Sequence, residues 1–215
     1  MRSFFNLDNP LMQFLNTLTD IVILNVICLI CCIPVVTIGA SLTALHYVTI
    51  RMARKEEGYI IRDFFKSFRQ NFIQSTVIWL LFLVISFFFY VDLEIFYSEK
   101  ANFPKILEQI IYVLYLFVWL TAMYAFPVLS RFSNTIRNTI KNAFLMSILN
   151  VFKTFLMAIV YVIPFFLLSL QMTLIDVLLL VGVAGPAYIN SFIWKGILQK
   201  YEPREEKFKE ADDSM

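Results

Sequence analysis

Long stretches without a formally charged side chain alternate with short charged segments along this chain. A helix needs about 20 consecutive apolar residues to cross the hydrocarbon core of a bilayer. Four stretches meet or approach that length, and they cover residues 71–91, 109–130, 154–175 and 177–194. The segments between them are too short to bury a core of their own. The pattern therefore predicts an all-α, polytopic transmembrane helical bundle.

The pattern near the amino terminus is less regular. The charge-free run Ile21–Ile50 would form a helix of roughly 45 Å, which is more than one span requires. If the segment from Pro10 is included, residues 10–53 supply two helices of about 20 residues each. Six helices are therefore favoured, with the first two forming a hairpin around an external turn at Pro34–Gly39. The alternative is five helices, of which the first is long and kinked.

The stretch CCIPVVTIGAS, residues 31–41, contains the residues that favour this turn. Pro34 lacks an amide donor and disrupts the preceding helical turn. Thr37 is a suitable N-cap for a helix that begins at residue 38 or 39, and Gly39 permits a tight bend. We expect Pro34, Thr37, Gly39 and Ser41 to serve the backbone here rather than a ligand.

Composition supports a membrane location. Sixty per cent of the residues are hydrophobic, 23 are Phe, and the mean hydropathy is +0.73, whereas soluble domains are about 45–50% apolar. This excludes a soluble or peripheral binding module. Cys28, Cys31 and Cys32 lie within an apolar run, so we expect them to be small core residues rather than disulfide partners or metal ligands.

The basic residues are strongly segregated. Fifteen of the 18 Lys and Arg residues fall in segments 51–69, 131–153 and 195–209. Basic residues that flank spans are retained in the cytoplasm, so these segments and the carboxyl terminus are predicted to lie on the cytoplasmic side of the plasma membrane. The amino terminus is also cytoplasmic with six helices, and external with five. We expect one domain at 1–201 and a charged, disordered cytoplasmic tail at 202–215.

Two basic segments have amphipathic helical patterns. Residues 59–75 place Phe64 and Phe68 opposite the basic side chains, which is typical of a helix lying in the membrane interface. In the second segment three asparagines follow one another at i+4 spacing and would form a polar stripe. Such surfaces anchor to anionic lipid or, alternatively, dock a partner protein. The candidate contact residues are Arg62, Lys66, Arg69, Asn134, Asn138 and Asn142.

The two halves of the chain show a weak internal similarity. A shift of eighty residues places Arg51 over Arg131 and Ser67 over Ser147. This suggests a repeat of helix, basic amphipathic connector and helix, although a chain rich in Phe also aligns with itself by chance. In transporters such repeats bracket a central site.

Few side chains in the sequence are candidates for catalysis or ligand binding. Asn16 and Asp20, one helical turn apart, would form a polar patch near the cytoplasmic end of the first helix, and an intramembrane carboxylate is retained mainly for function or pairing. The single histidine, His46, is interpreted as a packed or hydrogen-bonded residue. The sequence has no phosphate-binding loop, nucleophile elbow or metal-binding histidine pair. We therefore expect no enzymatic activity, no cofactor and no nucleic-acid partner.

Three segments of the sequence resemble a known family. The stretch PVVTIGASLTALHYVTIRMARKEEGYIIRDFFKSFRQNF, residues 34–72, is similar to the signature region of the YesL-like family of bacterial integral membrane proteins (domain of unknown function 624), and the likeness extends through residues 124–144 and 185–198. His46 departs from the tyrosine expected at its position. The resemblance implies a polytopic membrane protein of Gram-positive bacteria, often encoded beside genes for carbohydrate uptake and polysaccharide degradation. It brings no catalytic or binding residues with it.

The resemblance and the absence of catalytic motifs lead to one expected function. We expect an accessory or regulatory component of carbohydrate uptake and utilisation, with the lipid bilayer and a carbohydrate transporter complex as partners. The alternative is a small transporter or permease in its own right.

Overall fold

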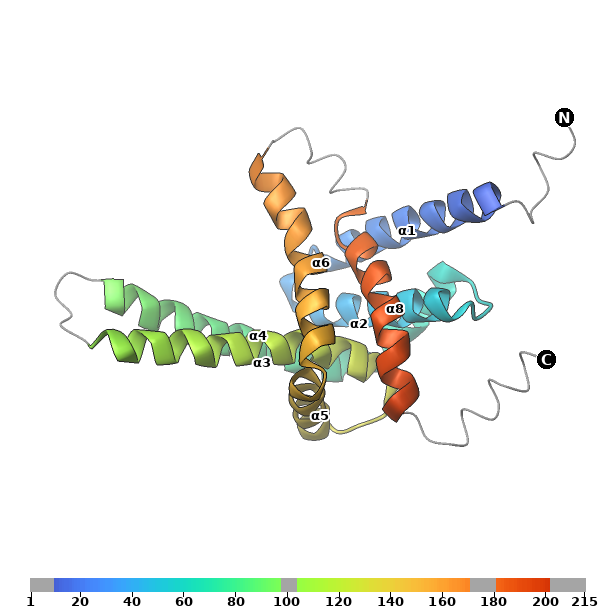
Figure 1. Ribbon diagram of the computed structural model, residues 1–215. Helices are drawn as coiled ribbons and strands as arrows, with labels where there is room; N and C mark the ends of the chain where they lie inside the picture. Colours follow the sequence, from blue (N-terminus) through green and yellow to red (C-terminus); the bar gives the residue numbers. More distant parts are fainter. Residues whose placement is uncertain (1–9, 98–103, 171–180, 202–215) are drawn as a thin grey trace, which may run out of the picture.

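The structure is a computed structural model that describes residues 10–97, 104–170 and 181–201 (Figure 1). These residues form seven α-helices and a short 3-10 helix, and they contain no strand. The elements are α1 (Pro10–Cys32), η1 (Val35–Thr37), α2 (Ile38–Arg54), α3 (Ile60–Tyr97), α4 (Lys105–Arg131), α5 (Ile136–Leu149), α6 (Val151–Leu170) and α8 (Ala184–Tyr201). The predicted all-α class is confirmed.

Several of these helices identify a membrane protein. Four helical segments within the described residues are long and apolar enough to cross a bilayer, and they are Leu11–Cys32, Val35–Arg54, Ile60–Phe96 and Ile106–Arg131. The bent pair α5 and α6 passes the same test only when it is counted as one span. The predicted count of six is not confirmed. Parts of the predicted spans 154–175 and 177–194, and the tail at 202–215, lie outside the described residues.

α1 and α2 form the predicted hairpin (Figure 1). The hydroxyl of Ser41 donates a hydrogen bond to the carbonyl oxygen of Cys28 at 3.0 Å. Further from the turn, Leu24 and Leu45 are both fully buried in one apolar cluster. The two helices therefore run antiparallel, and η1 forms the turn between them.

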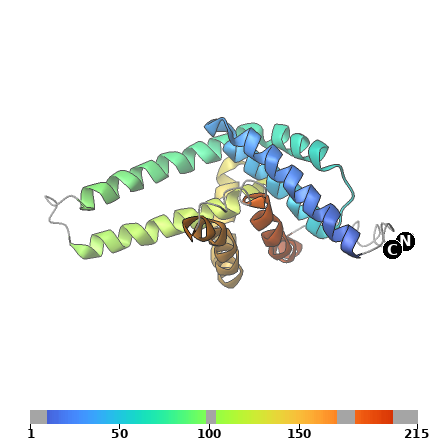
Figure 2. The same cartoon turned by 90° about the horizontal axis from the view of Figure 1, so that it is seen from above.

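α3 and α4 form a second and longer hairpin, which projects beyond the other helices (Figures 1 and 2). The rings of Phe89 and Tyr115 pack across it with their centroids 5.2 Å apart. α3 has 38 residues and continues without a break, which gives it a length of about 57 Å. The amphipathic stretch 59–75, predicted to be a helix in the membrane interface, forms the first part of α3 from Ile60 onward and buries Phe64 completely.

The second amphipathic segment forms a separate helix, α5, which ends before α6 begins. α5 and α6 meet at Asn150 with a bend of 100°. The side chain of Asn150 donates to the carbonyl oxygen of Met146 at 2.9 Å, and such a bond competes with continuation of the helix. The hydroxyl of Thr154 lies 2.9 Å from the carbonyl oxygen of Ser147 and 3.0 Å from that of Asn150, so the carbonyls near the bend keep partners.

The remaining helices are fixed by two buried contacts. Tyr124 of α4 and Trp194 of α8 are fully buried with their ring centroids 4.8 Å apart, and the Tyr124 hydroxyl lies 2.7 Å from that of Thr154 on α6. At the other end of α8, the buried Oδ1 of Asn25 accepts the backbone N–H groups of Val183 and Ala184 at 3.0 and 2.8 Å. α1 thus caps α8 by a contact that the sequence alone did not predict.

Candidate functional site

The turn between α1 and α2 contains the four predicted structural residues. Pro34 has extended backbone angles and separates α1 from η1, as expected. Thr37 occupies the N-cap position of α2, but its side chain accepts no capping hydrogen bond. Its hydroxyl instead lies 2.6 Å from the carbonyl oxygen of Cys31 and 2.7 Å from that of Pro34. The predicted N-cap hydrogen bond was therefore wrong. The Thr37 side chain binds carbonyl groups at the end of α1 and in the turn, and not N–H groups at the start of α2.

Gly39 also has a different role from the one predicted. It lies in the first turn of α2 with no positive φ, so it does not provide a bend. A Cβ atom here would collide with the carbonyl oxygen of Ser75 and lie 2.7 Å from the Cβ atom of Trp79. Gly39 is thus needed for the close approach of α3 to α2.

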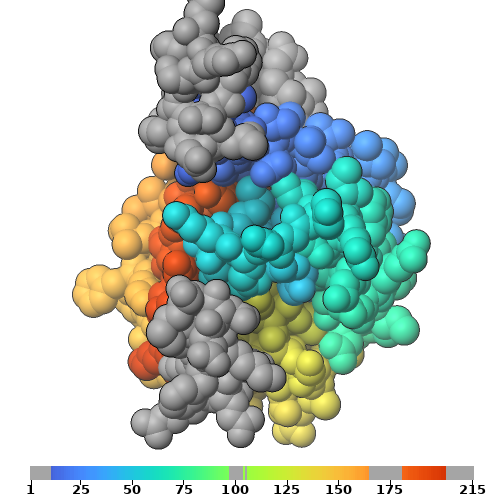
Figure 3. Space-filling model, turned by 90° about the vertical axis from the view of Figure 1, so that its right-hand side faces the viewer, coloured from blue at the N-terminus to red at the C-terminus, as the bar shows by residue number. Residues whose placement is uncertain are grey.

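A cluster of charged side chains lies at the other end of α2. The guanidinium of Arg51 pairs with Glu56 at 2.9 Å and with Asp63 at 2.8 Å, and it also donates to the carbonyl oxygen of Glu57. The absence of a side chain on Gly58 makes room for the carboxylate of Asp63. These contacts fix the loop between α2 and α3. Figure 3 shows this end of the molecule, where the start of α3 lies between α1 and the chain near residue 135.

The same cluster joins the two halves of the chain. Arg131, the last residue of α4, places a guanidinium nitrogen 3.3 Å from Oε1 of Glu56. The guanidinium carbons of Arg51 and Arg131 lie 5.8 and 5.5 Å from the ring centroid of Tyr47, within the range of cation–π attraction. We call this group of Tyr47, Arg51, Glu56, Asp63 and Arg131 the ionic cluster. These ion pairs and ring contacts join the ends of α2 and α4 to the α2–α3 loop, so the cluster is a structural clamp.

The predicted contact residues remain largely outside this cluster. Arg62, Lys66 and Arg69 are exposed along the first turns of α3. Asn138 is exposed and Asn142 half-buried on α5. The predicted stripe of three asparagines was wrong for Asn134, which precedes α5. The side chain of Thr135 accepts a hydrogen bond from the backbone N–H of Asn138, so Thr135 is the N-cap and the helix begins after it.

The predicted polar pair on α1 is not buried. Asn16 is exposed and Asp20 is half-buried on the outer side of α1. Neither side chain makes a hydrogen bond or ion pair within the described part of the chain. The structure therefore brings the two into one region of α1 but adds no group from another helix.

A cavity of about 590 Å³ lies between α2, α3, α4, α6 and the start of α8. Its volume is in the range of small-molecule sites. The walls are mainly aromatic and aliphatic and include Trp79, Phe82, Tyr115, Trp119 and Phe126. Among the described residues that line it, none carries a formal charge.

The polar groups of the cavity come chiefly from two helices. His46 of α2 is 95% buried and its Nε2 lies 3.4 Å from the hydroxyl of Tyr161 on α6. Nδ1 of His46 is buried with no hydrogen-bonding partner among the described residues. The interpretation of His46 as a packed, hydrogen-bonded residue is correct, but His46 also lines the cavity. Tyr161 could not be recognised from the sequence as a cavity residue, because it lies in an apolar stretch whose pattern predicts only a membrane span.

This arrangement suits binding better than bond-breaking chemistry. Aromatic walls with a few neutral polar groups are typical of ligand pockets. No group of three or more His, Cys, Asp or Glu side chains that could hold a metal ion occurs within residues 10–97, 104–170 and 181–201. The cavity therefore provides space, aromatic faces and uncharged hydrogen-bonding groups to a ligand.

Comparison with known proteins gives one match. The family described as "Protein of unknown function, DUF624" matches residues 21–93. No curated protein and no solved structure matches the chain. The matched segment contains about half of α1, all of α2 and most of α3, and with them His46, Trp79 and the loop of the ionic cluster. Over residues 21–93 this chain is therefore similar to the DUF624 family.

Proposed function

We propose that this protein is an accessory component of carbohydrate uptake in the bacterial plasma membrane, and that it binds an uncharged, hydroxyl-rich group in the cavity. The observation that carries this proposal is the aromatic cavity itself, whose described lining has no formal charge. The resemblance of residues 34–72 to the YesL-like family of Gram-positive bacteria, often encoded beside genes for carbohydrate uptake, supports it independently.

The chemistry of the cavity fits a sugar. The faces of sugar rings present C–H groups that pack on aromatic rings, and Trp79, Tyr115 and Trp119 supply such rings. Sugar hydroxyls need neutral donors and acceptors, and His46 and Tyr161 offer both. A charged ligand would find no opposite charge on the described walls, so the cavity favours a neutral one.

The α3–α4 hairpin supports the accessory role. Its outer half projects from the rest of the molecule and exposes apolar side chains, such as Phe88 at 62% and Val113 at 52%. A projecting two-helix arm can pack against the helices of a larger transporter. The basic segments that contain the ionic cluster and the carboxyl end of α8 would face the cytoplasm, as the distribution of Lys and Arg predicts.

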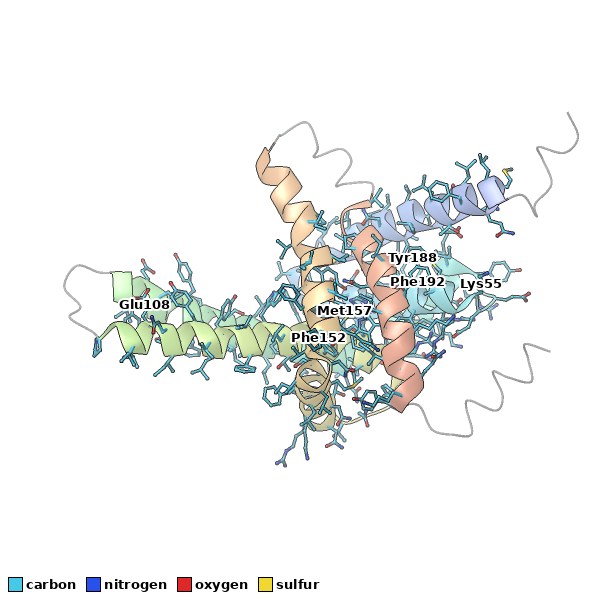
Figure 4. The ribbon with its side chains drawn as sticks, in the orientation of Figure 1. Lys55, Glu108, Phe152, Met157, Tyr188 and Phe192 are labelled. Carbon is cyan, nitrogen blue, oxygen red and sulfur yellow. The ribbon has the colours of Figure 1, made fainter. Side chains whose placement is uncertain are left out.

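Site-specific photo-crosslinking in native membranes tests this role. A crosslinking amino acid at Phe88, on the arm, should capture a carbohydrate transporter subunit. The matched control is Phe152 at the junction of α5 and α6, which is 87% exposed but lies away from the arm (Figure 4). Capture of no transporter subunit at Phe88, or equal capture at both sites, would contradict the accessory role.

A second function, transport by this chain alone, is favoured by one observation. The α1–α2 helix break lies beside the cavity, because Trp79 both lines the cavity and binds the turn. Broken helices next to a binding site are typical of secondary transporters. Purified protein in liposomes should then move neutral sugars across the membrane. Flux equal to that of protein-free liposomes would leave the accessory role as the better account.

A further inference from the structure

The turn of the α1–α2 hairpin is fixed at a definite height along α3. The indole nitrogen of Trp79 donates a hydrogen bond to the carbonyl oxygen of Val35 at 2.8 Å. Two residues into α2, Gly39 packs directly on the backbone of Ser75 and on Trp79. The turn therefore lies level with residues 75–79 of α3.

That height is near the middle of the apolar part of α3. The charge-free stretch of α3 runs from residue 71 to residue 91, between Arg69 and Asp92. Trp79 is about 12 Å from the first end of this stretch and about 18 Å from the other, at about 1.5 Å per residue. On α4, the ring of Trp79 packs on that of Phe126 with centroids 6.5 Å apart. Phe126 is about 6 Å from residue 130 and about 26 Å from residue 109, the two ends of the charge-free stretch of α4, so the turn stops well short of the far end of this helix.

The chemistry of the turn fits hydrocarbon rather than water. Its most exposed side chains are apolar: Ile33 is 77%, Val35 57% and Val36 50% exposed. A turn in water normally exposes Gly, Asn, Asp or Ser instead. The whole run from residue 21 to residue 50 has no formally charged side chain.

Several backbone carbonyl groups around the helix break have partners in the protein. The hydroxyl of Thr37 serves the carbonyl oxygens of Cys31 and Pro34, and that of Ser41 serves Cys28. The carbonyl of Val35 receives the indole of Trp79. Irregular backbone is tolerated at membrane depth only when its polar groups are satisfied in this way.

The end of α2 and the middle of α1 lie at the edge of the apolar region. α2 ends in the ionic cluster, where Arg51 pairs with Asp63 in the first turn of α3, before the charge-free stretch begins. Asp20 of α1 comes directly before Ile21, which shares a buried cluster with Val48. Figure 4 shows that Lys55, just past α2, and Glu108, near the tip of the arm, lie at opposite ends of the molecule.

From these observations we propose that α1 and α2 form a re-entrant hairpin. The hairpin enters the bilayer from the side of the α2–α3 loop, turns inside the apolar region before reaching the far side, and leaves on the side where it entered, so neither helix crosses the membrane. Asn16 and Asp20 then lie at the interface, and the expected external turn at Pro34–Gly39 becomes an intramembrane turn beside the cavity. The inference does not depend on the proposed function.

Spin-label depth measurements in lipid bilayers test the proposal. The three cysteines are replaced by alanine, and a label is attached at Val36→Cys, with Ile33→Cys as a second site on the turn. Labels at Leu80→Cys and Glu94→Cys, both exposed on α3, calibrate the middle and the far end of the span. Helical content by circular dichroism and a single symmetric peak in size-exclusion chromatography identify the labelled variants that fold.

The expected result is that the labels on the turn are accessible to oxygen and shielded from a water-soluble nickel complex, as at residue 80. Accessibility to the nickel complex equal to that at residue 94 would overturn the proposal, because it would place the turn in water on the far side. If the cysteine replacements prevent folding, maleimide labelling of Cys32 in intact cells gives the same distinction. Labelling there by a membrane-impermeant reagent from outside would also overturn the proposal.

Discussion

Arg51 and Arg131, eighty residues apart, bind the two carboxylate oxygens of the same Glu56 and place their guanidinium groups on the same Tyr47 ring. Each arginine lies in the last turn of its helix, α2 or α4. The two halves of the chain thus meet at one acidic residue. The shift of eighty residues suggested by the sequence superposes these arginines, and Ser67 and Ser147 are both 1% exposed. The similarity ends there, because α3 is continuous whereas α5 and α6 are bent.

Replacing Glu56 by Gln should destabilise the protein by about 1 to 3 kcal/mol, because partly buried guanidinium groups lose their shared counter-charge. Thermal unfolding in detergent micelles measures the change. Glu57→Gln is the matched control, since this neighbouring side chain is exposed and only its backbone carbonyl contacts Arg51. Equal stability of the two variants would show that the ionic cluster contributes little.

Gly39→Ala should also destabilise the fold, by about 1 to 3 kcal/mol, because the added methyl group overpacks the contact between α2 and α3. Gly196→Ala in α8 is the control. The nearest atom to a Cβ there is Nζ of Lys153 at 3.6 Å, an ordinary contact, and alanine favours a helix. The same unfolding assay should find Gly196→Ala equal to or more stable than the wild type. A harmless Gly39→Ala would mean that the two helices are less tightly packed than described.

Asn25→Ala should loosen the start of α8, because two backbone N–H groups lose their acceptor. Hydrogen exchange should become faster at residues 183–187, with little change in α4. Asn16→Ala, on the same helix but exposed, should leave exchange in α8 unchanged. Unaltered exchange in the Asn25 variant would contradict the capping role.

Trp79→Phe should weaken the turn between α1 and α2, because the carbonyl of Val35 loses its hydrogen-bond donor. Faster hydrogen exchange at residues 35–40 and a lower melting temperature are expected. Trp119→Phe provides the comparison, since Trp119 also lines the cavity but is 38% exposed and makes no hydrogen bond within the described residues. If the two variants show the same hydrogen exchange and the same melting temperature, the indole hydrogen bond does not stabilise the turn.

The parts of this structure that follow from local pattern could be predicted from the sequence. Pro34 within an apolar run too long for one span predicted the break between α1 and α2, and the charge-free runs predicted α3 and α4. The roles of Gly39 and Thr37 were misassigned because each depends on a neighbour: Gly39 on α3, and Thr37 on the carbonyl of Cys31, six residues earlier in the chain.

The candidate site was harder to predict, for a physical reason. The residues that line the cavity come from five helices, and its polar pair, His46 and Tyr161, is separated by 115 residues. Aromatic residues in a span have the same pattern whether they face lipid or a cavity. The role of Asn25 could not be predicted for the same reason, because the residues whose N–H groups it accepts lie 158 and 159 positions away in the sequence.

Sugar uptake in a deletion strain tests the central claim most directly. Deletion of this gene should lower the uptake of at least one neutral sugar or oligosaccharide, and the wild-type gene should restore it. Trp119→Ala, which removes one aromatic wall of the cavity, should not restore uptake although the variant reaches the membrane in equal amount. Uptake that is unchanged by the deletion, or fully restored by Trp119→Ala, would contradict the account.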